Sequence, residues 1–312
     1  MAVIGDFDPE EFQGVYRGPG DDDRARVLAE IQSLHGKWIV PVDTVVMGDV
    51  SWRPDLVAPK QQLLHLALTG DIPRALMRRM QAAQKHGYQV TVGLGSHRLD
   101  LGTLLALQEL NARIVAVDWD EEQTSVRGHR SVADWIATER ISLSPADLRC
   151  LAAARLGIAE TEATNERGRL YEEVLCLVFS QVPWLTVDEH AYRNESEEID
   201  LVLGVHATGH IAELAKGAVA IATAKNENKA TGSATVKYLK EQMANRKGRC
   251  RLGFLCSATS ISPAAKTEIL RGSQSSDVVI AQVDREDLLA LLADSEHLDH
   301  GVQALIRRAI DS

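Results

Sequence analysis

The sequence predicts an α/β fold in which helices flank a mixed β-sheet, with the same order of elements running twice along the chain. Three observations lead to this prediction. Short apolar runs typical of strands alternate with amphipathic stretches typical of helices. The two halves of the chain repeat the same order of such runs. A polar stretch with helical character separates the halves.

The first half begins with a loose N-terminal arm and continues with helices and strands in alternation. RARVLAEIQSL has the apolar spacing of an amphipathic helix, and GYQVTVGLGS and ARIVAVDWD are β-rich runs bounded by turn residues. The expected helices are 24–34, 74–86 and 101–110, and the expected strands are 38–46, 54–59, 63–70, 88–96 and 112–120.

The middle of the chain is predicted to be helical, with a serine cap before each of its two helices and a polar stretch at TEATNERG. The predicted organisation is therefore a domain over 1–125, a helical linker over 126–164 and a second domain over 165–312.

The second half repeats the order of the first. The expected helices are 167–182, 233–248, 262–270, 286–298 and 302–310, and the expected strands are 198–204, 218–226, 250–257 and 276–284. RARVLAEI matches RGRLYEEV, PDLVAP matches IDLVLG, and GYQVTVGLGS matches CRLGFLCS. We interpret this as a duplicated unit whose copies have diverged, although many domains of helices and mixed sheets would give a similar string.

Composition excludes several classes of protein. The net charge of −10 argues against a protein that coats nucleic acid by bulk electrostatics. No apolar run is long enough to cross a bilayer, and the acidic N-terminus lacks a secretory signal pattern. The four cysteines form no CxxC pair, so we expect reduced thiols and a cytoplasmic protein.

One stretch of the second half is strongly basic, and it is a candidate contact surface for phosphates. The alternative interpretation is a solvated helix face. The residues predicted to bind nucleic acid are Lys237, Lys240, Arg246 and Lys247.

Acidic residues and a lysine follow one another in the second half in an order that suits phosphodiester hydrolysis. That reaction needs carboxylates to hold a divalent metal and a group to orient the attacking water. Asp200 lies early in the strand EIDLVLG, and Lys225 ends the strand AVAIATAKN. Glu172 and Glu173 lie on the preceding helix, where one should face the sheet and the other solvent, and Glu172 is favoured by its spacing from Gly168. Mg²⁺ commonly uses only one or two protein carboxylates, so few acidic side chains suffice.

The runs Gly168 to Glu172, Ile199 to Val202 and Thr223 to Asn226 resemble the Mrr-like restriction endonucleases of the PD-(D/E)XK superfamily. The resemblance covers roughly 120 residues of the second half. It implies a restriction-endonuclease-like fold, Mg²⁺ or Mn²⁺ as cofactor, and hydrolysis of DNA in bacterial restriction or anti-phage defence. It assigns catalytic roles to Asp200, Lys225 and Glu172, with metal binding by Asp200 and Glu172.

The chain departs from the family pattern at Thr223, where the second acidic ligand is expected. Glu241, sixteen residues beyond Lys225, is the preferred replacement as a catalytic and metal-binding residue, and Glu227 is the other candidate. The third possibility is a degenerate site that hydrolyses nothing.

The first half lacks the same chemistry, because Asp55 matches Asp200 but no lysine matches Lys225. It is predicted to be a degenerate nuclease-like copy. Two alternatives to an active deoxyribonuclease stay open: an inactive nuclease-fold module that binds nucleic acid or a partner, and a nuclease effector regulated by a ligand. RNA is an alternative substrate to DNA, and cutting both strands of a duplex would favour a homodimer.

Overall fold

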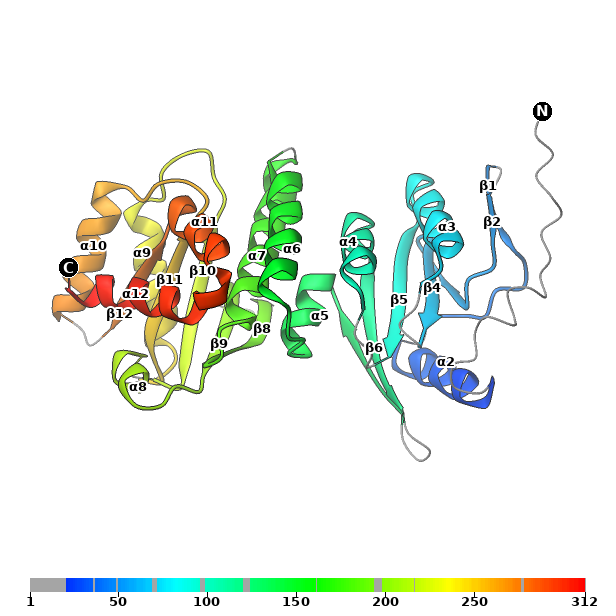
Figure 1. Ribbon diagram of the computed structural model, residues 1–312, viewed down its shortest axis with the longest axis horizontal. Helices are drawn as coiled ribbons and strands as arrows, with labels where there is room; N and C mark the ends of the chain where they lie inside the picture. The colour runs from blue at the N-terminus through cyan, green and yellow to red at the C-terminus, as the bar shows by residue number, and fades with distance from the viewer. Residues whose placement is uncertain are drawn as a thin grey trace. The chain divides into compact units, whose positions relative to one another are not determined.

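The structure is a computed structural model that describes residues 21–35, 37–48, 50–68, 72–95, 99–119, 124–160, 162–193, 198–215, 217–275 and 278–311. The chain divides into two compact units, Met1–Val132 and Ala133–Ser312. Each unit contains a five-stranded mixed sheet with helices packed against it, which confirms the predicted α/β class (Figure 1).

Unit 1 contains a sheet of strand order β3-β4-β5-β6-β7 and a separate hairpin of β1 and β2. β3 is antiparallel to β4, the β4-β5 and β5-β6 pairs are parallel, and β7 is antiparallel to β6. The strands are β1 (Val45–Met47), β2 (Val50–Trp52), β3 (Leu56–Ala58), β4 (Gln62–Ala67), β5 (Gln89–Gly95), β6 (Arg113–Trp119) and β7 (Thr124–His129). The helices are α2 (Asp21–His35), α3 (Arg74–Lys85) and α4 (Leu101–Glu109).

Unit 2 contains a sheet of strand order β12-β11-β10-β9-β8. β8, β9 and β10 form an antiparallel meander, and β10, β11 and β12 are parallel. The strands are β8 (Leu185–Arg193), β9 (Glu198–Val205), β10 (Val219–Lys225), β11 (Cys250–Ser257) and β12 (Val279–Val283). The helices are α5 (Val132–Thr138), α6 (Pro145–Ala159), α7 (Thr164–Ser180), α8 (His210–Ala215), α9 (Ser233–Ala244), α10 (Pro263–Ser275), α11 (Arg285–Ala293), η1 (Ser295–His297) and α12 (Leu298–Asp311).

Four strands of each sheet share one connectivity. In unit 1, β3 through β6 are joined by one antiparallel and two parallel steps, with α3 and α4 as the crossovers. In unit 2, β9 through β12 are joined by the same steps, with α9 and α10 as the crossovers. The two sheets differ at their edges, where β7 extends the first and β8 extends the second.

The boundary between the units differs from the predicted one. β7, which crosses residue 125, pairs with β6 and completes the sheet of unit 1. α6 packs along α7 inside unit 2 and buries the guanidinium of Arg155, whose Nε lies 2.7 Å from Glu173 Oε2. Residues 126–164 are therefore not a linker, because their apolar and charged side chains belong to the two cores.

Helix α6 begins where the sequence predicts. The Ser144 side chain caps it by accepting a hydrogen bond from the N–H of Asp147 at 3.1 Å, and Pro145 occupies the first turn. The predicted serine cap is confirmed at this helix.

Helices cover both faces of the unit 2 sheet, as two consecutive residues of β11 show. A Cβ added to Gly253 would lie 2.8 Å from the Met243 sulfur of α9, so this residue faces α9 and must be small. The next side chain, Phe254, contacts Phe179 of α7 with ring centroids 4.8 Å apart. Because successive strand residues point to opposite faces, α9 and α7 lie on opposite sides of the sheet.

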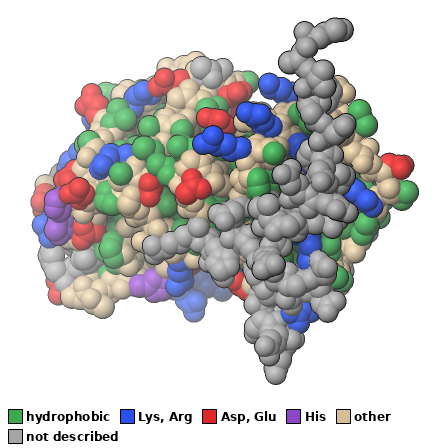
Figure 2. Space-filling view, turned by 45° about the vertical axis from the view of Figure 1, so that its right-hand side comes forward, with side chains coloured by type: hydrophobic (Ala, Val, Ile, Leu, Met, Phe, Trp, Pro, Cys, Tyr) green, Lys and Arg blue, Asp and Glu red, His purple; other side chains and the backbone are tan. Residues whose placement is uncertain are grey.

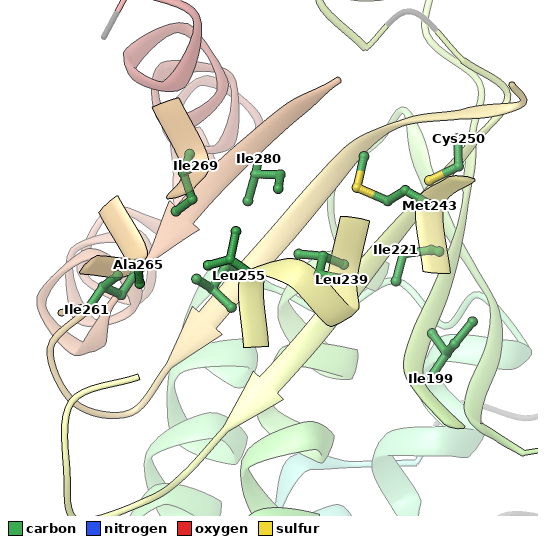
Figure 3. Close-up of a cluster of buried hydrophobic side chains, with 11 residues drawn as sticks. Ile199, Ile221, Leu239, Met243, Cys250, Leu255, Ile261, Ala265, Ile269 and Ile280 are labelled. Carbon is green, nitrogen blue, oxygen red and sulfur yellow. The ribbon is translucent and has the colours of Figure 1, made fainter. Parts of the chain in front are cut away.

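The core on the α9 side joins both crossover helices to the sheet (Figure 3). Leu239 and Met243 of α9 and Ala265 and Ile269 of α10 are buried against strand residues such as Leu255. This packing holds the carboxyl ends of β10 and β11 in place, which is where the polar residues discussed below lie.

Strands β7 and β8 and helix α8 are not among the elements predicted from the sequence. β8 reads LTVDEHAYR, which is too polar to stand out as a strand. It lies at the edge of the sheet, and its register shifts between Val187 and Glu189, which also breaks the alternation of polar and apolar side chains. Within the described residues, none of the helices is both long enough and apolar enough to span a membrane.

Candidate functional site

Asp200 lies where β9 and β10 separate. The antiparallel ladder between these strands ends at the pair Leu201 and Ala222. Beyond this pair, the Asp200 side chain replaces the backbone ladder, because its Oδ2 accepts a hydrogen bond from the N–H of Ala224 at 2.6 Å. Burial raises the pKa of Asp200 above its usual value, against the lowering effects of this hydrogen bond and of the Lys225 charge. The carboxylate is therefore fixed beside the end of β10.

Glu172 projects from α7 toward the same place. The pKa of Glu172 is raised from 4.5 to about 7, mainly by burial and next by the charge of Asp200. The charges of His190 and Lys225 oppose this shift, and that of Glu198 adds to it. Glu172 and Asp200 thus form a pair of partly buried carboxyl groups that repel each other when both are ionised.

Lys225 is the last residue of β10 and lies opposite Ser257 in the register with β11. Its positive charge lowers the pKa of both Asp200 and Glu172. The structure therefore brings together three of the four residues predicted to be catalytic.

His190 is part of this group and was not predicted from the sequence. Its side chain is 4% exposed, with Nε2 3.8 Å from Glu172 Oε2 and Nδ1 3.5 Å from Asp134 Oδ1. It lies on β8, the polar edge strand that periodicity did not detect. Spacing within the sequence offers no signal for it, because its partners are on α5 and α7.

Glu198 was also missed. It is exposed at the start of β9, and its charge raises the pKa of both Asp200 and Glu172. It is an exposed acidic residue near the site, two positions before Asp200 in the sequence.

The structure does not bring Glu241 to Asp200. Glu241 is exposed on α9, eight residues after Ser233, which is about 12 Å along a helix that leads away from the end of β10. The side chain that α9 sends to β9 is Gln242, whose Nε2 donates to the Glu198 carbonyl at 2.5 Å. Within the described residues no hydrogen bond or ion pair joins Glu241 to Asp200. Thr223 is 3% exposed, so its hydroxyl is closed to solvent.

Glu227, the other predicted replacement, lies beyond the end of β10 rather than on the strand. Its carboxylate is exposed and lies 3.7 Å from the Lys229 ammonium. Glu172 is consequently the second carboxylate that the fold places beside Asp200.

The residues of the predicted basic surface lie along α9 and just beyond its C-terminal end. Lys240 is paired with Glu268, with Nζ 2.8 Å from Oε1. Arg246 and Lys247 follow the end of α9 and lie near the start of β11. The first residue of β11 pairs with Val219, the first residue of β10. Lys225 is six residues along β10 from Val219, about 20 Å away. On the described part of the face drawn in Figure 2, Lys and Arg side chains are interspersed with Asp and Glu.

The carboxylates of Glu172 and Asp200 fit the type of donor that Mg²⁺ or Mn²⁺ prefers. Both pKa values are raised by burial, so a divalent cation would offset a repulsion that the protein leaves in place. In the parts of the chain that the structure describes, no group of three or more His, Cys, Asp or Glu residues is arranged to hold a metal ion. Mg²⁺ commonly binds proteins through one or two carboxylates and keeps several of its water ligands.

Unit 1 places Asp55 in the position that corresponds to Asp200. Asp55 Oδ2 accepts from the N–H of Leu66 at 2.8 Å, across the β3-β4 pair, as Asp200 does across β9-β10. Here the carboxylate also contacts Arg24, and its Oδ2 lies 3.0 Å from His65 Nδ1. Burial would raise the pKa of Asp55, but His65, Arg24 and the Leu66 amide outweigh it and lower the pKa to about 2.

Replacing Glu172 with glutamine is expected to stabilise the metal-free protein at pH 8 by on the order of 2–3 kcal/mol, and to change little near pH 4. Because the pKa of Glu172 is about 7 in the folded protein, above its ordinary value of 4.5, the free energy of unfolding falls as pH rises from 4.5 through 7. Urea unfolding in EDTA across this range would measure it, with the exposed Glu189→Gln as control. Parallel pH profiles for Glu172→Gln and wild type would contradict the assignment.

Replacing Asp55 with asparagine is expected to destabilise unit 1 by about 2 kcal/mol at pH 7. The pKa of Asp55 is lowered from 3.8 to about 2, so the ionised carboxylate stabilises the folded unit. This contribution to the free energy of unfolding is present above pH 3.8 and is lost as pH falls through 2. Hydrogen exchange of the β4 amides would report it. The control is Asp118→Asn, whose partner Arg127 and own side chain are both 49% exposed, and it should cost less than about 1 kcal/mol. Equal effects of the two substitutions would refute the prediction.

Comparisons of this chain with protein-family models, with curated proteins and with solved structures found no match.

Proposed function

We propose that this chain is a metal-dependent endonuclease that hydrolyses phosphodiester bonds of DNA. The observation that carries the proposal is the Asp200 carboxylate bound to the Ala224 amide at the end of β10, next to Lys225 and facing Glu172. A helix carboxylate, a strand aspartate and a strand lysine are the residues that the resemblance to PD-(D/E)XK nucleases assigns to catalysis. The proposal is supported by the antiparallel pairing of β9 and β10, in which the start of β9, with Asp200, meets the end of β10, with Lys225.

Asp200 and Glu172 would hold Mg²⁺ or Mn²⁺. Such a cation, when bound, polarises the scissile phosphate and lowers the pKa of its bound water. Lys225 would orient the attacking water and stabilise the negative charge that develops on the phosphate. His190, buried between Asp134 and Glu172, would fix the position of the Glu172 carboxyl.

Incubating the protein with plasmid DNA and Mg²⁺ tests the proposal, with Asp200→Asn as the matched variant. Wild type is expected to cut, and the variant to lose at least about a hundredfold in rate, because an amide cannot replace the anionic ligand. If wild type and variant leave DNA equally intact with Mg²⁺ and with Mn²⁺, the protein is not a nuclease of this kind.

A second function is favoured by Thr223, which is buried where the family carries an acidic ligand. A site with only two carboxylates suits a catalytically inactive nuclease fold that binds nucleic acid or a partner protein. Calorimetric titration with Mn²⁺ separates the two: micromolar binding that is lost in Asp200→Asn supports an active metal site, and no binding in either protein supports the inactive module.

We further infer that unit 1 is a second, degenerate copy of the same fold. The shared connectivity and the matching hydrogen bonds of Asp55 and Asp200 support this. Arg24 and His65 both contact Asp55, so this copy supplies the Arg24 cation where the proposed active copy would take a metal.

A further inference from the structure

A cleft of about 190 Å³ lies at the carboxyl ends of β10 and β11. Arg167 and Tyr171 of α7 form one wall, Leu156 and Ala159 of α6 a second, and Asn226 and Thr259 the rim. Ligands of open α/β sheets commonly bind at the carboxyl ends of the strands.

Two hydrogen-bonding atoms in the walls of this cleft have no partner among the residues that the structure describes. Tyr171 is 1% exposed, and its hydroxyl is buried without a hydrogen bond. The Nε of Arg167 is likewise buried without an acceptor. An unsatisfied buried polar group costs about 1–3 kcal/mol, more when it is charged, so two of them in one cleft indicate a ligand.

Several other polar groups that line the cleft already have partners, and Glu227 and Asn228 line it as well, with the Glu227 carboxylate 3.7 Å from the Lys229 ammonium. Asn226 Nδ2 donates to the Arg167 carbonyl at 2.9 Å, and Thr259 Oγ1 donates to the Lys229 carbonyl at 2.9 Å. Glu160 accepts from Arg285 at 2.5 Å. The two buried groups without a partner, a guanidinium N–H and a phenolic O–H, are both donors. A ligand that satisfies them must present acceptor oxygens, and the guanidinium favours an anion.

The cleft adjoins the candidate site on both of its elements. Tyr171 immediately precedes Glu172 on α7, and Asn226 immediately follows Lys225. A volume of about 190 Å³ is large enough to accommodate a phosphate group.

We propose that this cleft binds a non-scissile phosphate of the DNA strand, adjacent to the bond that is cut. Arg167 donates to the phosphate oxygens through its guanidinium, and Tyr171 donates through its hydroxyl. This inference rests on the proposed nuclease function for its ligand, and its test uses binding alone.

The test is the affinity of the full chain for a fluorescently labelled DNA duplex, measured by anisotropy in EDTA at several salt concentrations. Arg167→Gln is expected to weaken binding about tenfold and to reduce the slope of log K against log salt by about one, as for the loss of one phosphate contact. Tyr171→Phe keeps the ring in the core and is expected to weaken binding about threefold to fivefold. Arg307→Gln, an exposed arginine of α12, is the matched control and should bind as wild type does.

Wild-type affinity and an unchanged salt slope for both Arg167→Gln and Tyr171→Phe would overturn the inference, whatever the cleavage assay shows. Absence of DNA binding by wild type would overturn it as well. Binding that depends on Arg167 in a protein that cuts no DNA would uphold the phosphate cleft and reject the nuclease. Circular dichroism melts of each variant ensure that weakened binding is not a consequence of unfolding.

Discussion

Replacing Lys225 with alanine is expected to lower the rate of DNA cleavage by a factor of about 10² to 10³ at saturating Mg²⁺. The charge of Lys225 lowers the pKa of both Asp200 and Glu172, so the ammonium is close enough to act at the proposed site. Because the lysine ends a strand, removing its side chain leaves the core of the sheet unchanged. Single-turnover cleavage of a short duplex, followed on denaturing gels, would measure the loss.

The matched control for Lys225 is Lys229→Ala. Lys229 is 84% exposed and pairs only at 3.7 Å with Glu227, so its loss should change the rate less than twofold. Lys225→Arg keeps the charge but not the compact ammonium, and an intermediate rate is expected. A Lys225→Ala protein that cuts as fast as wild type would remove the lysine from the proposed mechanism.

Replacing Glu173 with glutamine is expected to destabilise unit 2 by about 3–5 kcal/mol. The guanidinium of Arg155 is 2% exposed and Glu173 is 1% exposed, with Nε 2.7 Å from Oε2. The substitution removes the negative charge and leaves Arg155 buried without it, while the shape of the side chain is kept. Because Arg155 belongs to α6 and Glu173 to α7, the loss would show that these helices fold as one body. Urea unfolding followed by circular dichroism would measure it.

Two controls separate this effect from the loss of any charge on α7. Glu166 is 39% exposed, and replacing it with glutamine is expected to lower the free energy of unfolding by less than about 1 kcal/mol. The double substitution Arg155→Leu and Glu173→Leu should recover much of the stability, since buried ion pairs are often replaced by apolar residues without loss. A loss below about 1 kcal/mol for Glu173→Gln would mean that the buried pair does not hold α6 to α7.

Much of the fold follows from local patterns in the sequence. The strands that became β5, β6, β9, β10, β11 and β12 are apolar runs bounded by turn residues, and their periodicity does not depend on distant contacts. The sequence therefore predicts Asp200 and Lys225, at the ends of two such strands, as candidate site residues.

The edge strands escaped prediction for a physical reason. β7 and β8 each have only one neighbouring strand, so polar side chains are tolerated along them and no alternation is enforced. His190 was missed with β8, although it lies between Glu172 and Asp134. The prediction of a linker was wrong for a similar reason. An arginine such as Arg155 of α6 is expected on the surface, and only its contact with Glu173 shows that it is buried.

The choice of the second carboxylate shows most clearly what the tertiary structure decided. By spacing alone, Glu241 and Glu227 were both within reach of Asp200. In the fold, α9 leads back along the sheet and carries Glu241 into solvent, while α7 brings Glu172 to Asp200 and burial raises its pKa to about 7. The sequence by itself determined the α/β class, the strand ends and the positions of Asp200 and Lys225. Only the tertiary structure decided which acidic side chain meets them, because that depends on the direction in which each helix crosses the sheet.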